Sequence, residues 1–360
     1  MAIISKRSDF TPLLLNWYDE NIRPLPWRTN NDPYRVWLSE IMLQQTQVVT
    51  VIPYYNSWLK TLPNVKAVSR ANLEYILKKW EGLGYYARAR NFHSACRAVE
   101  DSFGGRIPEN YQDFQSLPGV GPYIAGAVLS IAYNLQIPAV DCNAYRVVSR
   151  IKAINIPFNF CKNEIAEFLS GHVPSDRPGD FNQAIMDLGR EICTLKNPAC
   201  NTCPIKKYCC AFLNNSVEKY PFRTKHHKKP HFKVAVGIIW KKDEILISKR
   251  KEKGLLGGLW EFPGGKIKNG EGAKKCIVRE VNEELGVSIR PGEFLKQIKH
   301  AYTHFSITLD AYHCDYVDGI PVAIGCADWK WIKLDQISQF PFPKANHKLF
   351  NSLTGGGFTC

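Results

Sequence analysis

The spacing of apolar residues changes once along this chain, from a helical pattern to a strand pattern. Up to residue 212, apolar positions recur at helical spacing between glycine and proline breaks. This predicts helices at residues 34–49, 72–80, 88–103, 123–132 and 181–193. From Phe232 onward the pattern is that of strands, expected at residues 233–240, 244–249, 260–262, 295–302, 306–314 and 329–332, with one helix at 272–285. We therefore expect a mainly α N-terminal region followed by an α+β C-terminal region.

A basic, non-periodic segment with a proline at each end, residues 221–230, separates the two patterns. A chain of 360 residues is also longer than one ordinary core requires. We therefore expect a first domain at residues 1–220, a linker at 221–231 and a second domain at 232–353. The glycine-rich residues 354–360 are expected to form a flexible tail.

The net charge of +14 favours a polyanionic partner such as nucleic acid, although basic proteins are common and charge alone is weak support. No apolar run approaches the roughly 20 residues that span a bilayer, and the N-terminus lacks the apolar core of a signal peptide. The twelve cysteines are therefore expected to be reduced. We expect a protein of the bacterial cytoplasm, at the nucleoid, with no membrane partner.

Residues 117–123, Leu-Pro-Gly-Val-Gly-Pro-Tyr, precede an apolar helix. Gly119 and Gly121 allow a sharp turn and a close approach of the backbone to a ligand. The N-terminus of the following helix offers free N–H groups to a phosphate. We interpret the segment as a helix-hairpin-helix anchor for DNA, and a simple turn is the alternative for this short string by itself.

Two acidic residues lie in surroundings that suit cleavage of a glycosidic bond. Glu40 is in the apolar stretch of the expected helix 34–49, where an unpaired carboxylate is costly. Asp141 follows the apolar residues 137–140 and precedes Asn143 at the expected start of a helix. A carboxylate stabilises positive charge that develops on the sugar, and a protonated carboxyl group protonates the leaving group. The alternatives are a salt-bridged Glu40 and an Asp141 that only caps a helix.

Four of the cysteines form one compact set with the spacing Cys193-x6-Cys200-x2-Cys203-x5-Cys209. Thiolates bind either a zinc ion or an iron–sulfur cluster, and spacing alone does not decide between the two. A metal site is therefore expected here. The adjacent Cys210 is not expected to be a ligand.

Four stretches of the N-terminal region together resemble one known family. They are Leu25-Pro-Trp-Arg28, Asp32-Pro-Tyr34, residues 37–48 (WLSEIMLQQTQV) and residues 82–91 (GLGYYARARN). With them the chain resembles, over almost its whole length, the MutY-type adenine DNA glycosylases of the endonuclease III superfamily of helix-hairpin-helix glycosylases. The resemblance implies base excision repair of double-stranded DNA, in which adenine opposite 8-oxoguanine or guanine is flipped out and its N-glycosidic bond is hydrolysed. It also favours a [4Fe–4S] cluster over zinc at the four cysteines.

The resemblance implies roles for individual residues of the expected active site. Glu40 is the acid that protonates adenine at N7, Asp141 stabilises the oxocarbenium ion, and Asn143 orients the water and the carboxylates. Tyr123 stands where strand-nicking relatives have a lysine; because a phenol forms no imine, we expect a monofunctional enzyme with little or no AP lyase activity. Cys142 departs from the family, which usually has glycine there. The residues implied to line the adenine pocket are Leu25, Trp27, Arg28, Gln45 and Gln183.

Contacts with DNA and with the lesion are implied in both regions of the chain. Gln45 and Tyr85 are expected to probe or wedge into the base stack beside 8-oxoguanine, and residues 302–304 resemble a family loop that contacts 8-oxoguanine. The implied DNA or 8-oxoguanine contacts are Gln45, Thr46, Tyr85, Gly119, Gly121, Tyr302, Thr303 and His304. An ordinary strand end is the alternative for residues 302–304.

The C-terminal region contains a complete Nudix hydrolase signature from Gly265 to Val287. On its expected helix Glu280, Glu283 and Glu284 stand close together, so they repel one another unless a cation or an arginine sits among them. We interpret this as a Mg2+ site, with a solvated acidic face as the alternative. In MutY-type proteins the box is usually degraded and the domain recognises 8-oxoguanine. An intact box adds the hypothesis of Mg2+-dependent pyrophosphatase activity on oxidised nucleotides.

Three other functions are weighed against the adenine glycosylase. A strand-nicking relative of endonuclease III, acting on oxidised pyrimidines, is disfavoured by Tyr123 and by the second domain. A nucleotide-pool Nudix hydrolase with a DNA-tethering domain is disfavoured by the presence of Glu40 and Asp141. A non-enzymatic lesion binder would keep its DNA affinity after Glu40→Gln substitution and would never show turnover. The protein is expected to act as a monomer.

Overall fold

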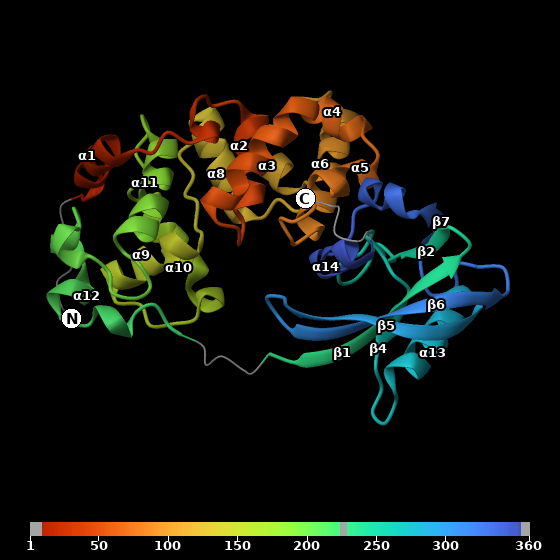
Figure 1. The fold of residues 1–360 in the computed structure, drawn as a ribbon. Coiled ribbons are helices and arrows are strands. Elements are labelled where there is room, and N and C mark those ends of the chain that lie inside the picture. The colour runs from red at the N-terminus through yellow and green to blue at the C-terminus, as the bar shows by residue number, and fades with distance from the viewer. Residues whose placement is uncertain (1–8, 224–228, 354–360) are drawn as a thin grey trace. The chain divides into compact units, whose positions relative to one another are not determined.

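The fold is described for residues 9–223 and 229–353 in a computed structural model. Contacts within the chain divide it into two compact units, residues 1–70 with 94–226 and residues 71–93 with 227–360. The first unit is helical and the second is built on a mixed β-sheet (Figure 1), which confirms the expected fold class. The expected tail, 354–360, and part of the expected linker, 224–228, lie outside the described residues.

Short helices make up the first unit. They are α1 (Thr11–Asn21), α2 (Pro33–Leu43), α3 (Val48–Thr61), α4 (Val65–Arg70), α7 (Tyr111–Gln115), α8 (Pro122–Tyr133), α9 (Cys142–Lys152), α10 (Phe158–Ser170), α11 (Pro178–Glu191) and α12 (Cys210–Leu213). α5 (Leu73–Lys79) belongs to the second unit. α6 (Ala87–Phe103) begins among the residues of the second unit and ends among those of the first. The expected helices at 72–80, 88–103, 123–132 and 181–193 are thereby confirmed to within a few residues.

The helix expected at residues 34–49 is wrong in its extent, because two helices occupy that stretch. Asp32 caps α2 by accepting a hydrogen bond from the Arg35 N–H at 2.9 Å, and Pro33 opens the helix as the sequence indicates. α2 ends at Leu43, and Gln45 adopts a left-handed backbone conformation with φ of 57°. The resulting turn redirects the chain before α3 begins at Val48.

Apolar packing in the first unit fixes the start of α9, which carries Asp141 and Asn143. The inward faces of α1, α9, α10 and α11 meet in one core that includes the fully buried Leu14, Val148 and Phe181.

Of the described residues, no helix combines the length and the apolar character that crossing a bilayer requires.

The second unit contains one sheet with the strand order β3-β2-β1-β6-β5. Its strands are β1 (His231–Lys241), β2 (Glu244–Lys249), β3 (Trp260–Glu261), β4 (Gly264–Lys266), β5 (Ser288–Ala301), β6 (Ser306–Asp318) and β7 (Asp328–Lys333). β1 and β6 are parallel, with Ala235 opposite Asp310, while β5 and β6 form an antiparallel hairpin. β4 pairs with β1, and β7 pairs with β2. Each strand expected from the sequence is present, and the expected helix 272–285 is α13 (Ala273–Leu285).

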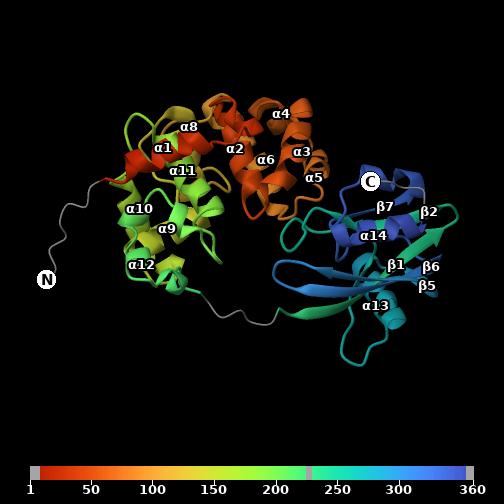
Figure 2. The same ribbon diagram turned by 60° about the vertical axis from the view of Figure 1, so that its left-hand side comes forward.

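One helix covers each face of this sheet, α13 on one side and α14 (Lys344–Leu353) on the other (Figure 2). The alternation of side chains along β1 explains the two layers, because neighbouring residues point to opposite faces. Ala235 packs in the core beneath α13 with Val281, whereas Val236 packs in the core beneath α14 with Leu349. The sheet is therefore buried on both faces.

Candidate active site

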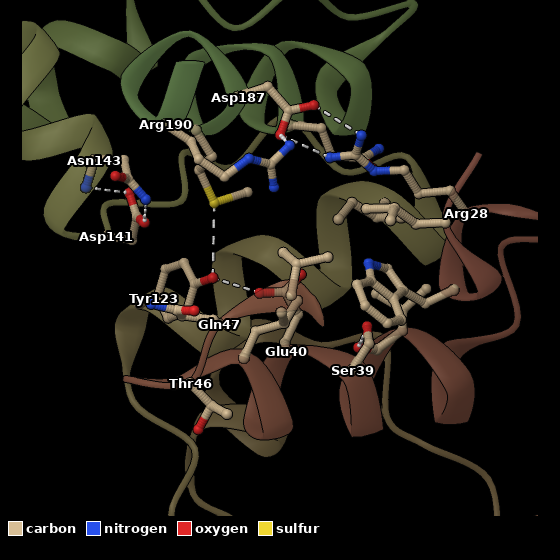
Figure 3. Close-up of a pocket in the computed structure, with 18 residues that line it drawn as sticks. Arg28, Ser39, Glu40, Thr46, Gln47, Tyr123, Asp141, Asn143, Asp187 and Arg190 are labelled. Atoms are coloured by element: carbon tan, nitrogen blue, oxygen red, sulfur yellow. Dashed lines mark hydrogen bonds and ion pairs between the residues drawn. The ribbon is translucent and has the colours of Figure 1, made fainter. Parts of the chain in front are cut away.

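A cavity of about 190 Å³ lies in the helical unit, between α2, α8, α11 and the start of α9. Its lining contains Leu25, Trp27, Arg28, Val36, Ser39, Glu40, Leu43, Thr46, Gln47, Val48, Tyr123, Ile131, Asp141, Asn143, Gln183, Met186, Asp187 and Arg190. Figure 3 shows Glu40 and Tyr123 on one wall, with Arg28, Asp187 and Arg190 facing them from the other. The cavity thus brings together residues more than 140 positions apart in the chain.

Glu40 is an acid held in an apolar wall. Its helix α2 is buried along most of its length, and Glu40 itself is only 6% exposed. Burial raises the pKa of Glu40 to about 7, and the negative charge of Asp141 adds to this effect, while a hydrogen bond from Tyr123 and the charge of Arg28 oppose it. Glu40 therefore holds a proton in a large fraction of molecules near neutral pH, as a general acid must.

Tyr123 reaches into the cavity from the first turn of α8, directly after the glycine hairpin. Its phenol donates a hydrogen bond to Glu40 Oε2, and its oxygen lies 3.7 Å from the sulfur of Met186. Burial and the neighbouring carboxylates Glu40 and Asp141 raise the pKa of Tyr123 well above its ordinary value. The side chain therefore remains a neutral phenol that orients Glu40.

Asp141 caps α9 and faces the cavity at the same time. Its Oδ1 accepts hydrogen bonds from the backbone N–H groups of Asn143 at 2.9 Å and Ala144 at 2.7 Å, and its Oδ2 accepts from Asn143 Nδ2 at 2.7 Å. Burial raises the pKa of Asp141, and these three hydrogen bonds oppose the rise by favouring the carboxylate. Asp141 therefore caps a helix, as one interpretation of the sequence expected, and also faces the cavity, as the other expected.

Arg146, one turn further along α9, fixes the amide of Asn143, and sequence reasoning did not identify it. Its Nη2 donates to Asn143 Oδ1 at 2.7 Å and to the Gly189 carbonyl at 2.6 Å, while its Nε donates to the Cys193 carbonyl at 2.7 Å. With Oδ1 occupied in this way, the amide nitrogen of Asn143 is directed at Asp141.

A buried carboxylate on α11, Asp187, was also not identified from the sequence. Arg28 binds it through two hydrogen bonds of 2.7 and 3.0 Å, and Arg190 lies 2.9 Å from it. Asp187 is 4% exposed. An acidic residue between apolar positions of an expected helix is the same signal that drew attention to Glu40, and it would have found Asp187.

The other residues expected in the adenine pocket divide into two groups. Leu25, Trp27, Arg28 and Gln183 line the cavity, as does Thr46. Gln45 does not; its place in the lining is taken by Gln47, and Gln45 itself is exposed. Its left-handed backbone conformation and exposure suit the other role expected for it, as a probe of the base stack.

The glycine hairpin presents an open helix N-terminus. Gly119 has a φ of 78°, a conformation that favours glycine, and Val120 N–H closes the turn on the Leu117 carbonyl at 3.1 Å. Gly121 is the N-cap of α8, and no atom lies within 4 Å of the position where its Cβ would be. A phosphate can therefore approach the first N–H groups of α8 closely.

The four expected metal ligands, Cys193, Cys200, Cys203 and Cys209, line one small cavity. Arg150 forms part of its wall, is 1% exposed and donates to Cys193 Sγ at 3.2 Å. Among residues 9–223 and 229–353, no three His, Cys, Asp or Glu side chains are arranged to hold a single metal ion. The donor set, four thiols around one cavity, fits a thiolate-bound group.

In the second unit, Tyr85 and the loop at residues 302–304 come together. The Tyr85 hydroxyl and Thr303 Oγ1 are 2.5 Å apart, and Tyr85 has a left-handed φ of 49°. Thr303 and His304 are exposed at the tip of the β5–β6 hairpin, whereas the ring of Tyr302 stacks on that of Phe305 with centroids 4.6 Å apart. Two residues implied to contact the lesion are thus neighbours.

An arginine sits among the glutamates of the Nudix signature. Arg279 pairs with Glu271 at 2.7 Å, with Glu280 at 2.8 Å and with Glu283 at 3.2 Å. Glu284 is outside this network, and burial together with the charges of Glu261 and Glu280 raises its pKa to about 7. The sequence left open whether a cation or an arginine relieves the repulsion among these glutamates. In the structure an arginine, Arg279, lies among them.

Comparisons with known proteins agree with this geometry. Residues 38–157 match the HhH-GPD superfamily of base excision DNA repair proteins, and residues 235–352 match the NUDIX domain. The chain is 35% identical over 305 residues to the adenine DNA glycosylase of Buchnera aphidicola subsp. Baizongia pistaciae, covering 84% of each chain. It is 30% identical to the adenine DNA glycosylase of Homo sapiens, covering 98% of this chain and 75% of the relative. The structure of a thermostable thymine-DNA glycosylase superposes with a TM-score of 0.54 at 28% identity, covering 57% of this chain and 95% of that one.

Proposed function

The chain belongs to the adenine DNA glycosylases, enzymes of base excision repair with an HhH-GPD region and a C-terminal NUDIX domain, and we propose that its substrate is adenine paired with 8-oxoguanine. The observation that carries the proposed chemistry is the buried acid Glu40, whose pKa is raised to about 7, in one cavity with Asp141, the carboxylate that caps α9. An acid and a carboxylate on one cavity suit cleavage of a glycosidic bond through a cationic sugar.

In the proposed mechanism an extruded adenine enters the cavity and Glu40 transfers its proton to N7. The bond between C1′ and N9 then breaks, the electron pair leaves with the base, and Asp141 stabilises the positive charge on the sugar. A water oriented by Asn143 adds to C1′ and releases the proton that returns Glu40 to its acid form. Tyr123 holds the Glu40 carboxyl group in place throughout.

Selection of adenine is proposed to involve the opposite wall. Adenine carries an exocyclic amino group, which donates hydrogen bonds, beside the N7 acceptor. Asp187, on the cavity wall that faces Glu40, offers carboxylate oxygens as acceptors for this amino group, and Arg28 and Arg190 hold the carboxylate in place. A base with a carbonyl in place of the amino group would set two acceptors against each other.

Monofunctional hydrolysis is proposed from Tyr123. Strand nicking through an imine requires an amine nucleophile. The hairpin places a neutral phenol in the cavity instead. Borohydride should therefore trap no covalent enzyme–DNA complex, and a trapped complex would contradict this part of the proposal.

Recognition of 8-oxoguanine is proposed for the surface formed by Tyr85, Thr303 and His304. Tyr85 and Thr303 are already in contact, and His304 is exposed beside them. An aromatic ring at a left-handed position beside an exposed hairpin suits insertion into a base stack, whose cost is a few kcal/mol. Double-stranded DNA containing the mispair is the proposed partner, and the protein is proposed to act as a monomer.

A [4Fe–4S] cluster is proposed at Cys193, Cys200, Cys203 and Cys209. The four thiols share one cavity, and the neighbouring Arg150 supplies a buried positive charge opposite the negative charge of thiolate ligands. The cluster's role is proposed to be structural, holding the segment that follows α11. Purified protein should contain four irons and four sulfides per chain, and one zinc per chain would refute the assignment.

A second candidate function is Mg2+-dependent hydrolysis of oxidised nucleoside triphosphates by the NUDIX domain. Glu284 favours it, because its Oε2 is buried with no partner among the described residues and its pKa is about 7. Glu280 and Glu283 are paired with Arg279 and would have to rearrange to bind a cation. Phosphate release from 8-oxo-dGTP, with Glu283→Gln as control, tests this candidate; no turnover by the unmodified protein eliminates it.

The main proposal is tested with a duplex containing one adenine opposite 8-oxoguanine, followed by alkali cleavage. We expect strand breaks at that adenine and none after Glu40→Gln substitution, with DNA affinity retained. An intact duplex in the presence of excess unmodified protein would refute the function. Turnover on adenine opposite guanine but not opposite 8-oxoguanine would refute the lesion assignment alone.

A further inference from the structure

Arg190 lines the cavity of the helical unit and is not among the residues that the sequence indicated for it. It lies on α11, three residues after Asp187. Figure 3 shows its guanidinium group on the wall that faces Glu40 and Tyr123. Its side chain is 32% exposed, so a ligand that enters the cavity can reach this positive charge.

Arg190 belongs to a series of ion pairs that leads from the surface into the cavity. Arg23 lies 2.8 Å from Glu191, which lies 3.0 Å from Arg190. Arg190 lies 2.9 Å from Asp187, which pairs with Arg28 at 2.7 Å. Three arginines thus accompany two carboxylates, and the series carries an excess positive charge. Because Arg28 already binds Asp187 through two hydrogen bonds, Arg190 is not needed to neutralise that carboxylate.

Part of the Arg190 guanidinium group stays available to a ligand. Its contacts with Glu191 use Nε and Nη2, and its contact with Asp187 uses Nη2. Among the described residues these are its hydrogen bonds and ion pairs, so they leave the two N–H groups of Nη1. A guanidinium group donates and never accepts, so the matching group on a ligand is a hydrogen-bond acceptor.

The backbone beside Arg190 shows which end of an extruded nucleotide it meets. A Cβ on the preceding residue, Gly189, would lie 2.7 Å from the Cβ of Asn143. In the proposed mechanism Asn143 and Asp141 act at the sugar carbon C1′. Arg190 therefore stands near the glycosidic-bond side of the cavity, on the wall opposite Glu40.

Adenine has one ring nitrogen on each side of its glycosidic nitrogen N9, and these two are N7 and N3. A base that turns N7 toward Glu40 turns N3 toward the opposite wall, and N3 is an acceptor. We propose that Arg190 donates a hydrogen bond from Nη1 to N3 of the extruded adenine and thereby stabilises the departing base. This inference rests on the proposed cleavage of adenine and adds a second contact to its leaving group.

The contact is expected to strengthen as the reaction proceeds. When the bond between C1′ and N9 breaks, its electron pair spreads from N9 into the ring, and N3 takes part of the negative charge. A fixed cationic donor stabilises charge that develops at such an atom. Arg190 keeps its proton, since a guanidinium group does not deprotonate in proteins, and the proton on N7 still comes from Glu40.

The test compares single-turnover release of adenine and of 3-deazaadenine, in which a C–H group replaces N3, each opposite 8-oxoguanine. N3 lies on the minor-groove edge, outside the base pair, so the analogue leaves the pairing intact. The ratio of the two rates is the N3 penalty. We expect this penalty to be at least tenfold smaller in Arg190→Met than in the unmodified protein, because methionine donates no hydrogen bond.

Two further variants serve as controls. Arg23→Met removes the outer arginine of the same ion-pair series, whose side chain is 56% exposed, and should leave the N3 penalty unchanged. Arg190→Lys keeps a cationic donor and should restore part of the penalty. Arg190→Met should also leave the slope of log affinity for DNA against log salt concentration unchanged, because a contact with a base neutralises no phosphate.

Equal N3 penalties in Arg190→Met and unmodified protein would overturn the inference while leaving the proposed function intact. Slower release of both bases by the same factor would show that Arg190 only holds Asp187, and would also overturn it. A salt slope smaller by about one in Arg190→Met would assign Arg190 to a phosphate instead. Equal release of adenine and 3-deazaadenine by the unmodified protein would overturn the inference without any variant. No adenine release at all by the unmodified protein would refute the proposed function itself.

Discussion

Replacing Glu40 with glutamine should greatly slow adenine release and at the same time stabilise the protein above neutral pH. The ionised carboxylate is costly at this position, because it is 6% exposed and its pKa rises from 4.5 to about 7. Glutamine has nearly the same shape, never ionises, and its amide oxygen can still accept the hydrogen bond from Tyr123. The substitution therefore removes the cost of the buried charge and little else.

The sign and the size of the effect follow from proton linkage. Between pH 4.5 and 7 the unfolded chain has lost the Glu40 proton while the folded protein keeps it, so the free energy of unfolding falls as pH rises. Above pH 7 both states are ionised and the loss is complete. The cost is about 1 kcal/mol at pH 5 and about 3 kcal/mol at pH 8. When the pH is raised from 5 to 8, the free energy of unfolding of Glu40→Gln should therefore increase by about 2–3 kcal/mol relative to that of the unmodified protein.

Denaturant unfolding at pH 5 and pH 8, followed by far-ultraviolet circular dichroism, measures this difference. Glu167→Gln, at an exposed position of α10, is the matched control and should change stability by less than about 0.5 kcal/mol at either pH. Single-turnover adenine release should fall by on the order of 10²–10⁴-fold in Glu40→Gln. An identical pH dependence of stability in Glu40→Gln and unmodified protein would refute the assignment of a desolvated acid at this position.

Three further outcomes test other parts of the site. Asp141→Asn should slow adenine release by about 100-fold or more, measured in single-turnover reactions, because it removes the charge opposite the cationic sugar; undiminished release would contradict that role. Tyr123→Phe should move the alkaline limb of the rate against pH upward, because its hydrogen bond lowers the pKa of Glu40; a downward shift would contradict it. Gly189→Ala should cost about 1–3 kcal/mol of stability in thermal or denaturant unfolding and slow release, because its Cβ would lie 2.7 Å from that of Asn143; normal rates would show that the contact relaxes freely.

The elements were largely predictable because their signals are local. Apolar spacing located α6, α8, α11 and the long strands, and the Asp32-Pro33 pair located the start of α2. The end of α2 was missed, since the apolar pattern continues past Leu43 while the chain turns. A left-handed residue at Gln45 is not visible in a pattern that only counts apolar positions.

The candidate site was predictable where motifs were contiguous and unpredictable where pairing was long-range. Glu40, Asp141 and the four cysteines could be named from neighbouring residues, and Asp187 carries the same local signal as Glu40, although its partner Arg28 is far away in the chain. Arg146 could not be named in this way, because it donates to backbone carbonyls more than 40 positions away. The grouping of residues 71–93 with the NUDIX unit was likewise invisible.

The sequence by itself determined the two kinds of architecture, the helix caps, the hairpin and the chemical inventory of the site, because each depends on residues within a few positions of one another. Only the tertiary structure decided the proton affinity of Glu40, the pairing of Asp187 with two arginines and the placement of Arg279 among the Nudix glutamates. Desolvation and ion pairing are properties of what surrounds a side chain in space, and those surroundings come from segments that the linear order keeps apart.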